Sequence, residues 1–326
     1  MFTLKDLEYR TIFVINCIHE RDLRVSNGEL LLTETVEDSD KTKTLTKLPF
    51  QKILALFIVG HIRITTPLIE KCKKYGVALV VMKPSLRPVF YWADFADANY
   101  LLRRRQYEFS TNNITIAKVI IRNKIQNQIT ALLSTRRKDE LTTQAVHTIE
   151  SALEKIEEIE DSNSLLGLEG VAAAAFFKAF YQDFHWHQRR PRTKCDELNS
   201  SLDIGYTILF NYIECFLRMF GFDLYVGVYH RMWFKRKSLV CDMMEPFRPI
   251  IDKTVRTAWN RKQFAKTDFL HQKGEYRLKY EKNGDYCKVF FDALIPYKLS
   301  IFKYVQCYYR CFMGCKSVSQ YPTFKL

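Results

Sequence analysis

Residues 221–252 read GFDLYVGVYHRMWFKRKSLVCDMMEPFRPIID, a stretch that combines one histidine, a basic aromatic loop and two carboxylates. Asp242 and Glu245 are three residues apart, which puts them on one face if the segment is helical. Two acids near an imidazole, here His230, suit a hard divalent cation bound through oxygen and nitrogen. A solvated loop followed by an amphipathic helix with exposed acids is the alternative interpretation.

The loop between the histidine and the two acids is both cationic and aromatic. Its members are Arg231, Trp233, Phe234, Lys235, Arg236 and Lys237. Cationic side chains neutralise phosphates, and aromatic rings stack on unpaired bases. The loop therefore favours an anionic, stackable ligand such as a nucleic acid.

These residues resemble a known family, the catalytic subunit of the CRISPR adaptation complex, which is the integrase that inserts new spacers. In that family a histidine in a loop precedes a D-[LM]-M-E-x-F-R-P helix, and here DMMEPFRP at residues 242–249 follows His230. A third family ligand lies in a G-x-E-[GA] context, which GLEG at residues 167–170 matches through Glu169. The resemblance covers the whole chain in length and layout.

The sequence between these motifs follows the same family order. A basic turn, RRPR, occupies residues 189–192, and Asn199 and the pair Gly205-Tyr206 come after it. One feature departs from a regular helix, because Pro246 follows Glu245 directly. A residue before proline is biased away from α geometry, so we expect the helix to begin or to kink there.

The resemblance implies the chemistry and the site. It implies that Glu169, His230 and Glu245 hold Mg²⁺ or Mn²⁺, and that Asp242 either binds the metal or orients another ligand. The implied reaction is a transesterification, in which the 3′-hydroxyl ends of a short protospacer duplex attack the CRISPR repeat. The implied partners are double-stranded DNA, a second copy of the chain, and a small ferredoxin-like subunit that bridges two homodimers.

Two rival functions share features of this pattern. A stand-alone nuclease acting on branched DNA would use the same ligands with water as the nucleophile. A non-catalytic DNA-binding scaffold would need none of them. The presence of all three family ligands favours an enzyme, and only integration requires a free 3′-hydroxyl.

The charge of the chain favours a polyanionic partner. The net charge is +14, and residues 1–100 carry 14 Lys and Arg against 12 Asp and Glu. The remaining residues carry 36 against 24, so the DNA is expected on the region after residue 100. The predicted DNA-binding residues are Arg103, Arg104, Arg105, Arg136, Arg137, Arg189, Arg190, Arg192, Lys235, Arg236 and Lys237. The alternative for each cluster is a solvated helix end or turn.

Length and periodicity predict an α+β protein of two domains. Residues 1–98 read as a β-rich dimerisation domain, with a tight hairpin at Asn27-Gly28. Residues 99–326 read as a larger all-helical domain that binds metal and DNA. Within it, a further hairpin is expected at Asn283-Gly284, and residues 320–326 are expected to form a loose tail.

The cysteines and the hydropathy place the chain in a cellular context. Nine cysteines occur without a C-x-x-C pair, which indicates neither a zinc ribbon nor a disulfide framework. There is no signal-peptide pattern, and no apolar run reaches the ~18 residues needed to span a bilayer. We therefore expect a protein of a reduced cytoplasm with no membrane partner, and the resemblance implies that the cell is prokaryotic.

Overall fold

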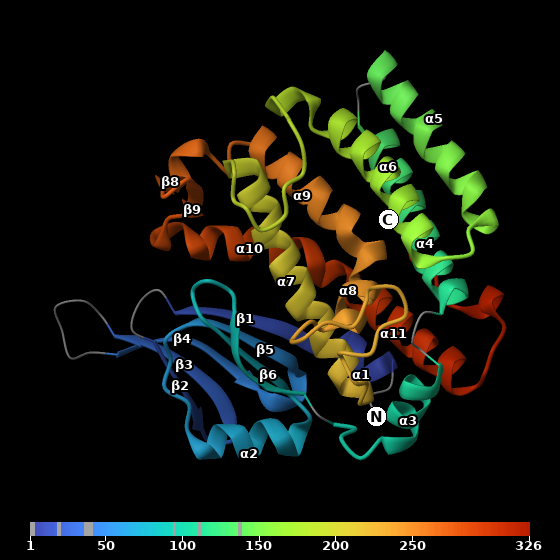
Figure 1. The fold of residues 1–326 in the computed structure, drawn as a ribbon. Helices are drawn as coiled ribbons and strands as arrows, with labels where there is room; N and C mark the ends of the chain where they lie inside the picture. Colours follow the sequence, from blue (N-terminus) through green and yellow to red (C-terminus); the bar gives the residue numbers. More distant parts are fainter. Residues whose placement is uncertain (1–3, 18–20, 36–41, 94, 110–112, 136–138) are drawn as a thin grey trace.

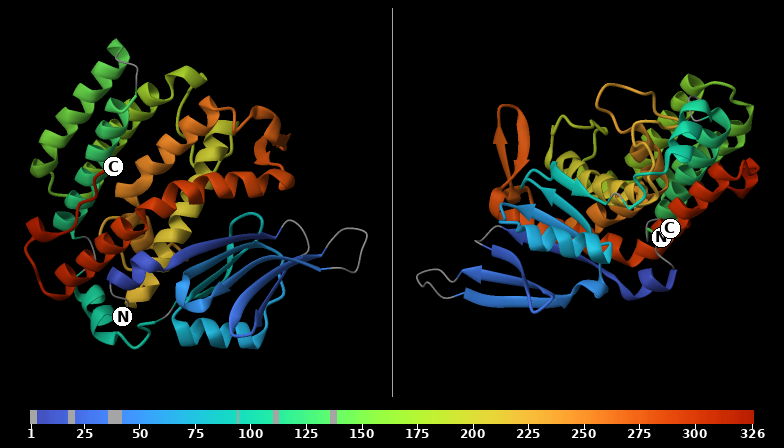
Figure 2. Two further views of the ribbon diagram at one scale, coloured as in Figure 1. Left: turned by 180° about the vertical axis from the view of Figure 1, so that it is seen from behind. Right: turned by 90° about the horizontal axis from the view of Figure 1, so that it is seen from below.

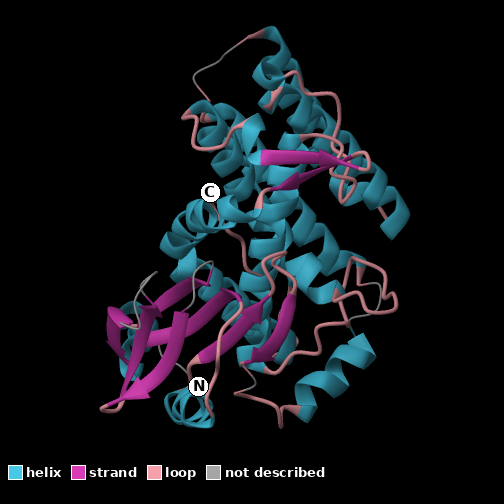
Figure 3. Ribbon diagram, turned by 90° about the vertical axis from the view of Figure 1, so that its left-hand side faces the viewer, coloured by secondary structure: helices cyan, strands magenta, loops and turns pink. Residues whose placement is uncertain are grey.

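The computed structural model describes residues 4–17, 21–35, 42–93, 95–109, 113–135 and 139–326. Strands fill the N-terminal region and helices most of the rest (Figure 1). Figure 2 shows the strand-rich part beside the helical part, and Figure 3 shows strands and helices in different colours. This is the predicted α+β layout.

The strand-rich part contains two sheets. In the four-stranded sheet the order is β1-β5-β6-β7, with β1, β5 and β6 parallel and β7 antiparallel to β6. The three-stranded antiparallel sheet has the order β2-β3-β4. The elements are α1 (Leu4–Tyr9), β1 (Thr11–Cys17), β2 (Arg21–Ser26), β3 (Glu29–Thr35), β4 (Thr42–Pro49), β5 (Ile53–Gly60), α2 (Thr66–Tyr75), β6 (Ala78–Met82) and β7 (Pro88–Trp92).

The predicted hairpin between β2 and β3 is confirmed. Asn27 and Gly28 have φ values of 50° and 79°, and Ser26 pairs with Glu29 across the turn. A two-residue turn of this kind requires positive φ at both central positions, which asparagine and glycine tolerate best. This turn fixes the register of the three-stranded sheet.

The helical part is built around α7, which lies in the middle of the bundle (Figure 1). A Cβ atom at Gly205 of α7 would come within 2.5 Å of Ile251 and 2.6 Å of Phe290, so glycine is required for the close crossing. The helices are α3 (Tyr100–Phe109), α4 (Ile114–Leu133), α5 (Glu140–Lys155), α6 (Ser162–Phe180), α7 (Glu197–Phe220), α8 (Ser238–Met244), α9 (Arg248–Asn260), α10 (Asn283–Leu294) and α11 (Lys298–Met313).

One hydrophobic core joins the four-stranded sheet to the helices. Phe57 of β5 stacks on Tyr212 of α7 with 6.0 Å between ring centroids, and it lies 5.1 Å from the ring of Phe291 in α10. Strands end and helices dominate near the predicted boundary at residue 98, but apolar packing crosses it. The division into 1–98 and 99–326 stays a prediction.

The hairpin predicted at Asn283-Gly284 is wrong. The turn lies ten residues earlier, at Lys273 and Gly274, between β8 (Phe269–Gln272) and β9 (Glu275–Leu278). Asn283 is instead the first residue of α10, whose buried face carries Tyr286, Cys287, Phe290, Phe291 and Leu294 at helical spacing. The helical period therefore outweighs the local turn signal. The β8–β9 hairpin is a small addition to the helical part.

The loose tail expected at residues 320–326 is also wrong. The Phe324 side chain is buried, with its ring centroid 4.6 Å from that of Phe247. Asn123 of α4 donates to the Phe324 carbonyl at 2.7 Å and accepts from its N–H at 2.8 Å. The tail is held because buried amides on α4 provide partners for its backbone.

Candidate metal centre

The residues predicted as metal ligands come from three different elements. Glu169 lies on α6, His230 lies in the loop before α8, and Glu245 opens a 3-10 turn between α8 and α9. The turn is the kink that Pro246 predicts, although Glu245 itself keeps helical φ and ψ of −54° and −47°. His230 Nε2 lies 3.9 Å from Glu245 Oε1, so the structure brings these two side chains together.

Asp242 organises the histidine loop rather than facing the other acids. Its buried carboxylate accepts the N–H groups of Val228, Tyr229 and His230 at 2.7, 3.1 and 2.9 Å. It also lies 2.7 Å from His230 Nδ1. With Nδ1 donating to Asp242, Nε2 keeps the free lone pair that a metal ligand needs. This arrangement suits a residue that orients a ligand.

The loop can wrap around Asp242 only because residue 227 has no side chain. A Cβ at Gly227 would lie 2.4 Å from Asp242 Oδ2 and 2.9 Å from the backbone of Ser238. We predict that Gly227→Ala displaces the loop and weakens divalent-ion binding at least about tenfold, as loss of an outer-shell partner does. Calorimetric titration with Mn²⁺ measures this, and Gly170→Ala, where a Cβ meets nothing within 4 Å, is the matched control. Equal affinities in the two variants would contradict the prediction.

A lysine that the sequence analysis missed lies between the two glutamates. The Lys124 Nζ atom is 2.6 Å from Glu245 Oε2 and also pairs with Glu169. Its side chain is only 8% exposed. Lys124 shares its helix face with the buried residues Ala117 and Ile121, seven and three positions earlier. The sequence signal that could have identified Lys124 is a cationic residue on an otherwise apolar helix face.

The charges of this cluster stabilise each other. Burial alone lowers the pKa of Lys124, but Glu169 and Glu245 outweigh it and raise that pKa. Burial raises the pKa of Glu245, yet Arg248, Lys124 and His230 together bring it down to about 2. Glu245 is therefore ionised at neutral pH, as a metal ligand must be. Arg248 Nε lies 2.8 Å from Glu245 Oε2.

Tyr229 is a second member that the sequence analysis missed. Its hydroxyl donates to Glu169 Oε2. Burial and the Glu169 charge raise the pKa of Tyr229, so the phenol remains a donor. Tyr229 therefore fixes the orientation of the Glu169 carboxylate through the oxygen that Lys124 does not contact.

The donor set fits a divalent cation. Two carboxylates hold the Lys124 ammonium between them, and the imidazole Nε2 of His230 lies 3.9 Å from one of them. Within the described ranges, no three His, Cys, Asp or Glu side chains are arranged so that they could hold an ion as they stand. The ammonium between the carboxylates accounts for that, because a bound ion and Lys124 would compete for the same oxygens.

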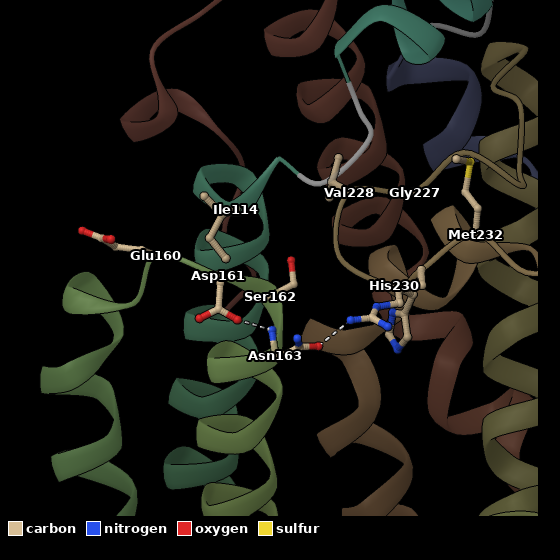
Figure 4. Close-up of a pocket in the computed structure, with 10 residues that line it drawn as sticks. Ile114, Glu160, Asp161, Ser162, Asn163, Gly227, Val228, His230 and Met232 are labelled. Carbon is tan, nitrogen blue, oxygen red and sulfur yellow. Dashed lines mark hydrogen bonds between the residues drawn. The ribbon is translucent and has the colours of Figure 1, made fainter.

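A pocket of about 550 Å³ opens next to His230. It lies between the first turn of α6 and the loop of residues 227–232 (Figure 4). Asp161 caps α6 by accepting the N–H of Asn163 at 2.8 Å, and Asn163 Oδ1 accepts from Arg231 at 2.6 Å. The pocket gives a polar substrate access to the histidine.

Some of the predicted DNA-binding residues have partners inside the protein. Arg189 donates to Asn199 Oδ1 at 2.8 Å and to Asp203 Oδ1 at 2.5 Å, and its side chain is largely buried. Lys237 donates to the buried Glu214 at 2.5 Å. Both side chains contribute to the fold in this state of the molecule.

The three arginines of α3 are also engaged. Arg103 donates to the Gly221 carbonyl at 3.2 Å, and Arg104 pairs with Glu108 at 2.9 Å. The Arg105 guanidinium lies over aromatic rings. The contacts of Arg103 and Arg105 anchor α3 to the helical part, and DNA binding by this triplet stays a prediction.

The remaining predicted DNA-binding residues differ in solvent exposure. Arg190, Arg192 and Lys235 are exposed, and Arg236 is half-buried. Next to Lys235, the side chains of Trp233 and Phe234 are 77% and 81% exposed. Two further candidates, Arg136 and Arg137, lie outside the described residues.

Comparison with known proteins assigns the family. The family model described as CRISPR associated protein Cas1 matches residues 18–291, and the chain belongs to this family. A relative from Thermodesulfovibrio yellowstonii, named CRISPR-associated endonuclease Cas1 1, is 29% identical over 73% of this chain and 78% of its own length. Another from Leptospira interrogans, named CRISPR-associated endonuclease Cas1, is 33% identical over 53% of this chain and 75% of its own length.

Solved structures share the fold. A chain of a partial Cas6-RT-Cas1–Cas2 complex superposes with a TM-score of 0.73 and 21% identity, over 97% of this chain and 99% of that one. A casposase bound to integration product gives a TM-score of 0.73 and 19% identity, over 94% and 92%. A Cas1 protein from Thermotoga maritima also gives 0.73, with 17% identity, over 96% and 99%. Among the described residues, no helix is both long and apolar enough to cross a membrane.

Proposed function

We propose that this chain is a CRISPR adaptation integrase that joins the 3′-hydroxyl ends of a short protospacer duplex to the CRISPR repeat. The observation that carries the proposal is that Glu169 and Glu245 share the buried Lys124 ammonium while His230 Nε2 lies 3.9 Å from Glu245. The Cas1 relatives named as endonucleases and the casposase fold support an enzyme that breaks and joins DNA. It would act where the CRISPR array lies, in the prokaryotic cytoplasm.

Glu169, Glu245 and His230 would hold Mg²⁺ or Mn²⁺. When bound, the ion would polarise the scissile phosphate and lower the pKa of the attacking hydroxyl. Asp242 holds the imidazole so that Nε2 faces the site, and Tyr229 holds the Glu169 carboxylate. The pocket beside His230 then admits the reacting end of the DNA.

The nucleophile distinguishes integration from hydrolysis. We propose to compare short duplexes with free and with blocked 3′ ends on a supercoiled target that carries a repeat. Covalent joining that requires the free 3′-hydroxyl supports the integrase. Target cleavage that is independent of the 3′ end would support the rival nuclease, in which water attacks. Activity that is unchanged when Glu169, His230 and Glu245 are all replaced with alanine would leave only the DNA-binding scaffold.

The proposed partners are a second copy of the chain and a small ferredoxin-like subunit that bridges two dimers. The solved complexes with a similar chain are described as containing Cas2; the first of these chains is longer, and this chain spans 36% of it. The strand-rich part is near neutral, and its edge strand β4 is largely exposed. An exposed strand edge is a ready surface for pairing.

We predict that the purified chain is a homodimer at micromolar concentration. The expected contact is the strand-rich part, because the helical part carries the excess positive charge that would repel a second copy. Light scattering gives the mass directly. A monomer that persists at micromolar concentration, where the salt is high enough to screen charge, would contradict this arrangement.

A further inference from the structure

Several turns of the helical part carry basic residues in a conformation that L-amino acids disfavour. Among the described residues after position 100, the non-glycine residues with positive φ are His185, Arg192, Lys194, Lys235, Lys262, Lys273 and Cys315. Five of these seven are Lys or Arg, with φ between 50° and 65°. Asparagine and glycine adopt this left-handed region most easily.

The turns of the strand-rich part place mainly asparagine and glycine at positive φ. Its turns place Asn27, Gly28 and Gly76 at positive φ, and these residue types suit the geometry. Leu86, with φ of 61°, is an exception whose buried side chain packs in the core. Residues in sparsely populated conformations persist where the surrounding structure and a function require them. These five lysine and arginine residues, in four turns of the helical part, have no such buried side chain, which indicates that the charge has a use.

Four of these residues, Arg192, Lys194, Lys262 and Lys273, form what we name the turn-tip cluster. The turns that carry them meet at one end of the helical part, where the β8–β9 hairpin adjoins the start of α7 and the end of α9 (Figure 1). Tyr276 of the hairpin donates its N–H to the Lys194 carbonyl at 2.9 Å.

Further hydrogen bonds hold this end of the molecule together. Ser200 of α7 donates to the Tyr276 carbonyl at 2.8 Å. Trp259, near the end of α9, donates to the neighbouring Ser201 at 3.3 Å. Asp203 accepts the backbone N–H of Arg192 at 2.9 Å. The turns that carry the cluster are therefore hydrogen-bonded to the hairpin and to α7, and they are not independent loops.

The side chains of the cluster are available to a ligand. Arg192, Lys262 and Lys273 are exposed, and so are Arg190, Arg261, Lys266 and Arg277 around them. Glu275 offsets some of this charge, since it lies 3.9 Å from Lys194 and 2.9 Å from Arg277. The surface remains cationic, which favours contacts with phosphates.

We infer that the turn-tip cluster binds the phosphates of duplex DNA away from the reacting end. The inference rests on the proposed function, which supplies DNA as the substrate. Arg189, in the same turn as Arg192 and Lys194, has its guanidinium 5.4 Å from the ring of Tyr206, and the guanidinium of Arg248, which pairs with Glu245, lies 4.7 Å from the same ring.

The test removes the positive charge of three cluster residues and replaces each with a residue that suits the same turn conformation. In the triple variant Arg192→Asn, Lys262→Asn and Lys273→Asn, each new residue suits positive φ, so the melting temperature should stay the same or rise. The slope of log affinity against log salt for a protospacer-length duplex should fall by about three, because each phosphate contact contributes about 0.9.

The control variant carries Lys52→Gln, Lys73→Gln and Lys74→Gln, three exposed lysines of the strand-rich part, and loses the same net charge. Its salt slope should equal that of the wild type. An unchanged slope in the Asn variant, an equal decrease in the control, or a lower melting temperature in the Asn variant would each overturn the inference. Loss of binding to the small partner subunit with intact DNA binding would assign the surface to protein and also overturn it. Failure of the proposed function itself would appear separately, as no 3′-dependent joining by the wild type.

Discussion

Replacing any one of Glu169, His230 or Glu245 with alanine is expected to abolish strand transfer and to leave duplex binding intact. The three side chains would supply the oxygen and nitrogen donors of the candidate metal centre, and a bound ion would stabilise charge only where the phosphate reacts. Loss of about 4 kcal/mol of transition-state stabilisation corresponds to roughly a thousandfold lower rate. Phosphate contacts elsewhere supply the affinity.

The measurement pairs a strand-transfer rate with a duplex Kd and a calorimetric titration with Mn²⁺. Glu154→Ala, an exposed acid on α5, is the matched control and should match the wild type in all three. Because Glu245 is buried against Arg248 and Lys124, Glu245→Gln serves as a second variant that keeps the side-chain volume. Near wild-type joining by an alanine variant would remove that residue from the site. For Asp242→Ala we expect a milder loss, since Asp242 acts through the histidine loop.

The second large effect concerns the metal-free protein. We predict that Lys124→Met lowers its free energy of unfolding by about 3–5 kcal/mol, because removing one partner leaves buried charge without compensation. Glu169 and Glu245 would then repel each other at close range in a poorly solvated position. A divalent ion should restore the stability, and should bind more tightly than in the wild type because it no longer displaces an ammonium group.

Thermal unfolding with and without Mn²⁺ measures both effects. Lys118→Met, on the more exposed side of the same helix, controls for the loss of charge and for the change in helix propensity. If Lys124→Met melted at the wild-type temperature without metal, the ammonium would have no role as a counter-charge. If it bound Mn²⁺ more weakly than the wild type, Lys124 would assist the ion and not occupy its place.

The sequence predicted those members of the candidate site that a short local pattern identifies. The spacing of Asp242 and Glu245, and the motif around Glu169, lie within short stretches that can be recognised directly. The 3-10 turn falls at Pro246, where proline interrupts the regular helix, although Glu245 before it keeps helical φ and ψ. Each of these predictions depends on neighbours within a few positions along the chain.

The predictions failed, or were missing, where distant segments meet. Lys124 pairs with a glutamate 45 residues away, and Tyr229 with the same glutamate 60 residues away. No spacing rule connects such residues before the helices are packed. The hairpin at Asn283-Gly284 and the loose tail failed for a related reason. The burial of one face of α10 and of the Phe324 side chain determines the conformation of those segments. Burial depends on the assembled fold and not on the neighbouring residues alone.

The core shared by β5, α7 and α10 joins the four-stranded sheet and the helices into a single cooperative unit of unfolding. Phe57 cannot leave its place between Tyr212 and Phe291 without opening the sheet and the helices together. Amides in β5 and α7 should therefore exchange with solvent only through the same global opening. A cut at residue 98 would yield two fragments that each expose half of a core.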